Sequence, residues 1–189
     1  MKTGDVWSNP ARVEPSQPLM LAIDPGDVHV GLAQFRRDKK GRWGCVWAGE
    51  MTPPEFLDWL AKGLRVRAWD QIVLESWHLF PSAAPVYVGS DMPTSRLIGA
   101  IHAMVAYVTP ESWLNPPPPI EMQDPQIKVP TRSMLRRRKL HSMAKHLGVS
   151  GDHASDAELH GFHYLIRNRL PIRDRDTTRQ GLPLSHELW

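Results

Sequence analysis

The stretch that decides the fold is residues 19–33, LMLAIDPGDVHVGLA. An apolar run ends abruptly in Asp24, and a Pro-Gly pair then marks a turn before a second apolar, β-branched stretch. This pattern predicts a buried strand over residues 19–24 and a second strand over about 28–36. Because an acid at the end of an apolar strand is costly to bury alone, Asp24 needs a partner, and the usual partner is a metal ion.

The composition is that of a globular protein with a real core. The 189 residues favour one compact domain with tails, and they are 41% hydrophobic and 23% charged. The net charge is only +3, but the pI is about 9.2 and the positive charge is clustered, which suggests a polyanionic partner. The single cysteine, Cys45, excludes an internal disulfide and a multi-cysteine zinc site. No apolar run could span a membrane or form the core of a signal peptide, so we expect a cytoplasmic protein.

The order of predicted elements indicates an α/β fold. Three strands joined by short connections form an antiparallel meander, and sequential β–α–β units follow. Beyond the first two strands, the predicted elements are a strand at 42–50, a helix from the capping Thr52 to about 64, a strand at 71–75, a helix at 94–108, a short strand at 120–123, a basic helix at 131–148 capped by Thr131 and ending at Gly148, and a last helix from 150 or 152 to about 170. The expected fold is a mixed five-stranded sheet, three strands antiparallel and then parallel strands, with helices on both faces. We expect residues 1–18 to be a loose lead-in, 19–170 the domain, and 171–189 a polar tail.

Two later acids occupy settings that could complete a site with Asp24. Glu75 ends an apolar strand, as Asp24 does, and Asp156 lies in the first turn of the last helix, three residues after His153 and on the same helical face. Converging carboxylates repel one another unless cations neutralise them, and oxygen-rich sites suit Mg²⁺ or Mn²⁺. Two such ions about 4 Å apart can drive phosphodiester hydrolysis.

Each of these residues also has a structural interpretation. The sequence at Asp24 is common in turns, Glu75 suits the exposed end of a strand, and Asp156 suits the positive end of a helix dipole. His153, His160 and other histidines of this helix are more often partly exposed structural residues than ligands. The conjunction of the three acids in this order and setting favours the functional interpretation.

The ordered motifs resemble the RuvC-type Holliday junction resolvases, within the ribonuclease H-like superfamily. The motifs that carry the resemblance are IDPG at 23–26, VLE at 73–75, SRLIGA at 95–100, QIK at 126–128 and HASDA at 153–157. The resemblance covers about residues 19–170. It implies a homodimer that cuts four-way DNA junctions with Mg²⁺, with Asp24, Glu75 and Asp156 as metal ligands and His153 in the fourth site position.

The chain departs from the family pattern at three places. Many members have Asp where His153 stands; a histidine there could bind metal or act as general acid or base, and Asp152 could substitute if the register is shifted by one. His78, flanked by Trp77 and Phe80, occupies the position where many members carry an aromatic wedge. The long loop after Glu75 and the proline-rich insertion suit a divergent, phage-type member.

A basic segment leads into the predicted metal site. The residues that we expect to contact DNA phosphates are Lys128, Arg132, Arg136, Arg137 and Lys139; Arg132, Arg136 and Lys139 would share one helical face. A solvated basic surface is the alternative. Trp77, His78 and Phe80 could stack on unpaired bases at a branch point, or simply pack within their loop.

These features together predict a metal-dependent, structure-selective DNA endonuclease acting on branched DNA. One alternative is another ribonuclease H-like nuclease, which would act on RNA, forks or flaps. The other is a non-catalytic junction-binding module. The helix at 94–108 has a long apolar stripe, which could form a homodimer interface or only cover the sheet.

Overall fold

The computed structural model describes residues 19–77, 92–108, 116–140, 142–149 and 151–173. Its elements, in chain order, are β1 (Leu19–Asp24), β2 (Val30–Arg37), β3 (Trp43–Met51), α1 (Pro53–Arg65), β4 (Gln71–Glu75), α3 (Pro93–Val108), β5 (Ile120–Gln123), the short 3₁₀ helix η1 (Pro125–Ile127), α4 (Lys128–Arg137), α5 (Met143–His146) and α6 (Asp152–Arg167). The five predicted strands are all present, and β1, β4 and β5 have the predicted bounds.

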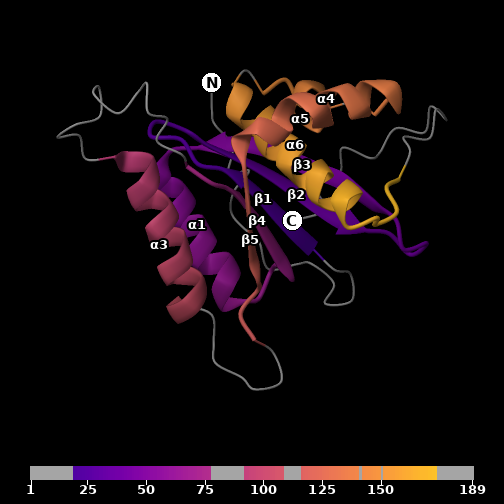
Figure 1. Cartoon of the computed structure of the whole chain (residues 1–189). Coiled ribbons are helices and arrows are strands. Elements are labelled where there is room, and N and C mark those ends of the chain that lie inside the picture. The colour runs from indigo at the N-terminus through magenta and orange to yellow at the C-terminus, as the bar shows by residue number, and fades with distance from the viewer. Residues whose placement is uncertain (1–18, 78–91, 109–115, 141, 150, 174–189) are drawn as a thin grey trace, which may run out of the picture.

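The strands form one sheet in the order β3-β2-β1-β4-β5. β1 pairs antiparallel with β2 and β2 with β3, whereas β4 runs parallel to β1 and β5 parallel to β4. Helices α1 and α3 cover one face, and α6 with α4 and α5 covers the other (Figure 1). This is the predicted mixed sheet between two helical layers.

Alternation along the strands divides the core into two clusters. In β1, Leu19, Leu21 and Ile23 pack on the α1 and α3 side, whereas Met20 and Ala22 pack on the α6 side. Because side chains alternate between the faces of a strand, Asp24 continues the set that faces α6. In β4, Val73 packs on the α6 side, so Glu75, two residues further along the strand, projects from that face as well.

The start of α1 follows from its sequence. Thr52 and Glu55 form a capping box in which the Thr52 backbone N–H donates to the Glu55 carboxylate at 3.0 Å, and proline occupies the first turn. Phe56, Leu60 and Leu64 are fully buried against the sheet, so this predicted helix is confirmed.

The prediction of one basic helix over 131–148 is wrong. The segment forms α4, which begins at Lys128, and the separate short helix α5. Thr131 is not a cap but a buried residue inside α4, while Ser142 caps α5 by accepting from the Lys145 N–H. Lys139 has a left-handed φ of 54°, so the shared helical face does not extend to it. The predicted end at Gly148 is confirmed by its φ of 69°, which glycine tolerates best.

Other differences are shifts of a few residues at element ends. β2 begins at Val30, after the exposed turn residues 27–29, and α6 ends at Arg167. The predicted lead-in 1–18, and the tail from 174 onward, lie outside the described residues, so these domain boundaries stay predictions. Among the described helices, none combines the length and apolarity needed to cross a membrane.

Candidate active site

The parallel pairing of β1 and β4 brings two acids to one edge of the sheet. Ile23 pairs with Leu74, so the next residues along the two strands, Asp24 and Glu75, end their strands side by side. Asp24 is only 4% exposed. A pair of carboxylates this close and this poorly hydrated requires positive charge or protons nearby.

The third acid arrives on α6, which lies close to the sheet. A Cβ on Gly31 would lie 2.0 Å from the backbone oxygen of His153, so only glycine permits this approach. Oε1 of Glu50 accepts a hydrogen bond from the Ala154 N–H at 3.1 Å, which satisfies one of the free donors in the first turn of α6. These contacts set the position of Asp156 above the strand ends.

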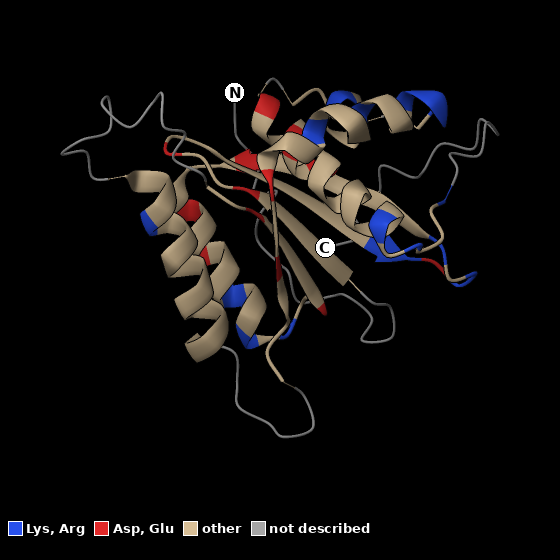
Figure 2. Ribbon diagram, in the orientation of Figure 1, with Lys and Arg blue, Asp and Glu red and all other residues tan. Residues whose placement is uncertain are grey.

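The three predicted acids converge on the ammonium group of Lys128. Its Nζ lies 3.1 Å from Asp24 Oδ1, 2.7 Å from Glu75 Oε2 and 2.9 Å from Asp156 Oδ2. Burial opposes the charge on Lys128, but the carboxylates outweigh burial and raise its pKa. In Figure 2 the acidic segments gather where the strand ends meet α6, next to basic α4. The three acids therefore share the Lys128 ammonium group as a counterion, and its place among them is called the cation position below.

His153 is tied directly to Asp24. Its Nδ1 lies 2.6 Å from Asp24 Oδ2, and this hydrogen bond raises the pKa of the histidine. Burial raises the pKa of Asp24, while the hydrogen bond from His153 works in the opposite direction. The structure thus brings His153 to the acids, and Asp24 acts as the group that orients its ring.

Sequence reasoning missed His160 as a member of this cluster. The ring is fully buried, with Nε2 2.8 Å from Glu75 Oε2 and Nδ1 3.0 Å from Gln123 Oε1. The expectation of a partly exposed structural histidine is wrong for this residue. Burial lowers the pKa of His160 to about 4. Its spacing from Asp156, one helical turn, was the sequence signal that could have identified it.

The donor set fits a divalent metal ion. Asp24, Glu75 and His160 each offer a ligand atom, and these atoms lie within 4.8 Å of one another. Asp156 Oδ2 also contacts the Lys128 ammonium group, at 2.9 Å from Nζ. Carboxylate-rich sets of this kind suit hard cations such as Mg²⁺.

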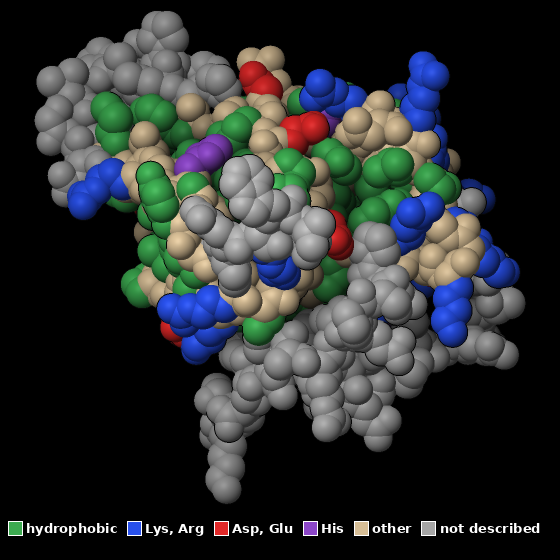
Figure 3. All heavy atoms as spheres, turned by 90° about the horizontal axis from the view of Figure 1, so that it is seen from below, with side chains coloured by type: hydrophobic (Ala, Val, Ile, Leu, Met, Phe, Trp, Pro, Cys, Tyr) green, Lys and Arg blue, Asp and Glu red, His purple; other side chains and the backbone are tan. Residues whose placement is uncertain are grey.

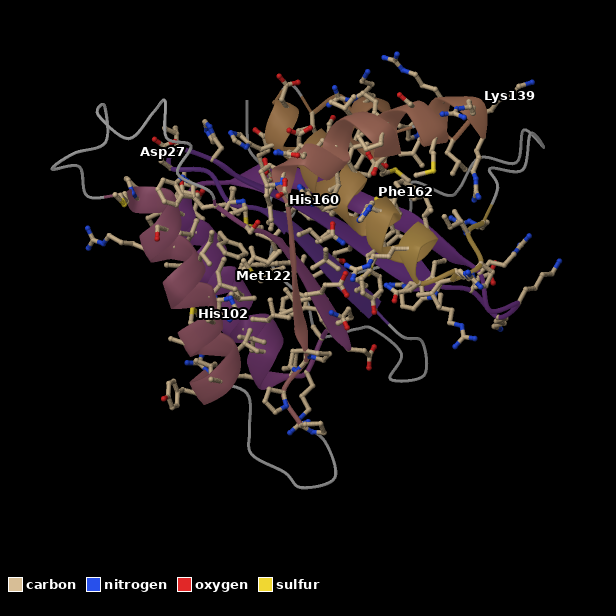
Figure 4. All side chains as sticks on the ribbon, in the orientation of Figure 1. Asp27, His102, Met122, Lys139, His160 and Phe162 are labelled. Atoms are coloured by element: carbon tan, nitrogen blue, oxygen red, sulfur yellow. The ribbon has the colours of Figure 1, made fainter. Side chains whose placement is uncertain are left out.

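The residues predicted to contact DNA lie at different distances from the acids. Arg132 reaches the site, with Nη2 3.2 Å from Asp156 Oδ1, while Arg136, Arg137 and Lys139 are exposed on and beyond α4. Lys139 points away at the far end of this segment, as Figure 4 shows. His78 and Phe80 lie outside the described residues, and Trp77 is partly buried. A DNA-binding role stays a prediction for each of these residues and for Lys128.

Solved structures share this architecture. Thermus thermophilus RuvC in complex with Holliday junction substrate superposes with a TM-score of 0.54 and 13% identity, covering 80% of this chain and 95% of that chain. The complex of the fowlpox virus resolvase with its substrate Holliday junction DNA gives 0.53 and 12%, covering 79% and 98%. No protein-family model and no curated protein sequence matches the chain. The protein has the ribonuclease H-like fold seen in these resolvases.

Proposed function

We propose that this protein is a metal-dependent, structure-selective DNA endonuclease that resolves Holliday junctions. The observation that carries the proposal is the convergence of Asp24, Glu75 and Asp156 on one cation position, beside the basic helix α4. Three converging acids with a basic surface next to them suit the hydrolysis of a phosphodiester, whose own charge must be held near the acids.

Asp24, Glu75 and Asp156 would hold two Mg²⁺ ions, for which Mn²⁺ is a substitute. When bound, the metal supplies the positive charge that activates a water and stabilises the leaving oxygen of the phosphodiester. The protein's own contribution is to fix the three carboxylates on rigid elements: two on strand ends and one on a helix. Lys128 neutralises the same carboxylates, so its ion pairs must be exchanged when a divalent cation enters.

His153 is the candidate for proton transfer. Its Nδ1 is hydrogen-bonded to Asp24, so Nε2 is the ring nitrogen that would give a proton to the substrate or take one from it. The Asp24 carboxylate favours the protonated ring and thereby prepares it to act as a general acid. Direct metal ligation by His153 is the alternative, and both roles place this residue at the reaction.

The basic residues of α4 would hold the DNA backbone. Arg132 bridges from Asp156 to the exposed surface, and Arg136 and Arg137 extend that surface along the helix. Such contacts are electrostatic and independent of sequence, which suits an enzyme selective for DNA shape. The two similar structures solved with Holliday junctions support a branched substrate.

A homodimer would place two sites on one junction, as symmetric cleavage requires. The apolar stripe of α3, with Leu97, Ile101 and Val105, faces the core and covers the sheet, so it is not free to form the interface. An interface through α3 would use its outer face, where Tyr107 is 88% exposed. On the face shown in Figure 3, exposed hydrophobic side chains are interspersed with basic ones. A monomeric mass in solution at micromolar concentration would contradict the dimer.

A substrate panel tests the proposed function. End-labelled four-way DNA junctions, replication forks, flaps, linear duplex and an RNA–DNA hybrid would each be incubated with the protein and Mg²⁺. We expect the four-way junction to be cut fastest, by paired incisions near the branch point. Faster cutting of forks, flaps or the hybrid would instead favour another nuclease of this fold. Tight junction binding without cleavage in either Mg²⁺ or Mn²⁺ would favour a non-catalytic module.

A further inference from the structure

Glu75 and Gln123 are paired residues on neighbouring parallel strands. The register of β4 and β5 places them directly opposite each other at the ends of the strands. Paired residues of adjacent strands project from the same face of a sheet, and here that face is covered by α6. The strand pairing therefore creates a fixed gap between a carboxylate and an amide, with α6 above it.

The His160 ring fills this gap from α6. It contacts Glu75 Oε2 through Nε2 at 2.8 Å and Gln123 Oε1 through Nδ1 at 3.0 Å. His160 is fully buried, and Gln123 is only 3% exposed. In Figure 4, His160 is labelled where α6 passes over the sheet. A side chain held at both ring nitrogens in a dry setting has one orientation, and so does the carboxylate to which it is bonded.

The donors and acceptors around His160 determine which ring nitrogen carries the proton. A neutral imidazole carries one N–H, so it cannot donate to both Glu75 and the Gln123 carbonyl. Within the described part of the chain, Gln123 Nε2 is a buried nitrogen without a hydrogen-bond partner. Rotating the Gln123 amide by 180° resolves both problems: its NH₂ then donates to Nδ1, and the ring proton lies on Nε2, directed at Glu75.

We propose that His160 and Gln123 form a buried positioning relay that aims the Glu75 carboxylate at the cation position. Gln123 fixes the tautomer and orientation of His160, and His160 donates its Nε2 proton to Glu75 Oε2. Glu75 Oε2 also lies 2.7 Å from Lys128 Nζ, so the relay holds this oxygen in contact with the bound positive charge. The inference rests on the proposed metal centre, but it assigns His160 to positioning rather than to direct ligation.

Metal binding in three variants tests the relay. In His160→Leu the new side chain has about the volume of histidine but no hydrogen-bond donor. In His160→Gln the amide retains an N–H donor near the position of Nε2. His102→Leu is the control, because His102 is exposed on α3, across the sheet. Calorimetric Mn²⁺ titration should show affinity about 10-fold weaker for His160→Leu, largely restored in His160→Gln, and unchanged in His102→Leu. Wild-type affinity in a folded His160→Leu variant would overturn the relay.

Nitrogen-15 NMR of the histidine rings tests the relay without any activity. In the metal-free protein, His160 should be the Nε2–H tautomer, and it should keep that proton when Mg²⁺ is added. A ring protonated at Nδ1, or loss of the Nε2 proton on adding Mg²⁺, would overturn the proposal and indicate a direct ligand. A protein that keeps this tautomer and binds Mn²⁺ but cuts no nucleic acid would refute the proposed function while leaving the relay intact.

Discussion

The ammonium nitrogen of Lys128 lies 2.9 Å from Oδ2 of Asp156, although the two residues belong to different helices. Lys128 is the first residue of α4, and the exposed arginines follow along the same helix. One lysine thus connects the acidic cluster to the candidate DNA-binding helix. In the absence of metal it also serves as the counterion of the acids, and a divalent cation must compete with it.

The first prediction concerns this counterion. Replacing Lys128 by methionine leaves poorly hydrated carboxylates without their cation, which should lower the free energy of unfolding by about 3 kcal/mol. Urea denaturation at pH 7 with a chelator measures this loss. Excess Mg²⁺ should stabilise Lys128→Met more than the wild type, because the metal takes over the charge.

Lys62→Met is the matched control for that experiment. Lys62 pairs with Asp58 on the exposed surface of α1, where an ion pair contributes less than about 1 kcal/mol. A Lys128→Met protein with the stability of Lys62→Met, and with no extra response to Mg²⁺, would argue against Lys128 as the counterion.

The second prediction concerns the close approach of α6 to the sheet. A methyl group at Gly31 would collide with the His153 backbone, so Gly31→Ala must push α6 and Asp156 away from the strand ends. We expect a loss of about 1–3 kcal/mol in unfolding free energy, together with weaker Mn²⁺ binding. Gly99→Ala in α3 is the control, since nothing lies within 4 Å of its added Cβ. That change should be neutral or stabilising, by up to about 1 kcal/mol.

The third prediction concerns acid stability. The folded protein holds the pKa of His160 at about 4, below the ordinary value of 6.5. Between these two values the unfolded chain binds a proton that the folded chain does not, so the free energy of unfolding falls as pH falls from about 6.5 to 4. The full loss is about 3 kcal/mol. In His160→Gln, this pH-dependent loss of unfolding free energy should be absent. The same dependence of unfolding free energy on pH in the variant and the wild type would contradict the prediction.

The fourth prediction concerns the basic helix. Arg137→Gln removes one exposed charge from α4, and the plot of log K against log salt for a four-way junction should become shallower by about one unit. Arg65→Gln, at the end of α1 on the other side of the sheet, should leave the slope unchanged. Equal slopes for Arg137→Gln and the wild type would remove this residue from the DNA interface.

Local sequence patterns predicted the sheet well. Apolar runs with turn residues at their ends defined β1 and β4, because buried strands in such a sheet are nearly continuous in hydrophobicity. The expected adjacency of the first and fourth strands also predicted that Asp24 and Glu75 could complete one site. The break between α4 and α5 was missed, because basic residues continue through it and the left-handed turn at Lys139 has no glycine.

The candidate site was only partly predictable for a different reason. Asp24 and Glu75 stood out because charge at the end of an apolar strand is costly to bury, and Asp156 stood out because it shares a helical face with His153. His160 did not stand out, because a histidine on the buried side of a helix resembles many structural histidines. Its partners, Glu75 and Gln123, are defined by the pairing of two distant strands, which sequence spacing does not reveal. The insertion of Lys128 among the acids likewise depends on how α4 packs against α6.

The central claim is that Asp24, Glu75 and Asp156 form a metal-dependent nuclease centre. Its most direct test is cleavage of a labelled four-way DNA junction, in Mg²⁺ and in chelator, by the wild type, Asp24→Asn and Asp27→Asn. Asp27 is an exposed acid three residues beyond Asp24 that points away from the cluster (Figure 4). The account predicts Mg²⁺-dependent cleavage by the wild type and Asp27→Asn, and loss of activity by at least about 100-fold in Asp24→Asn. Equal cleavage by all three proteins, or none by the wild type, would contradict it.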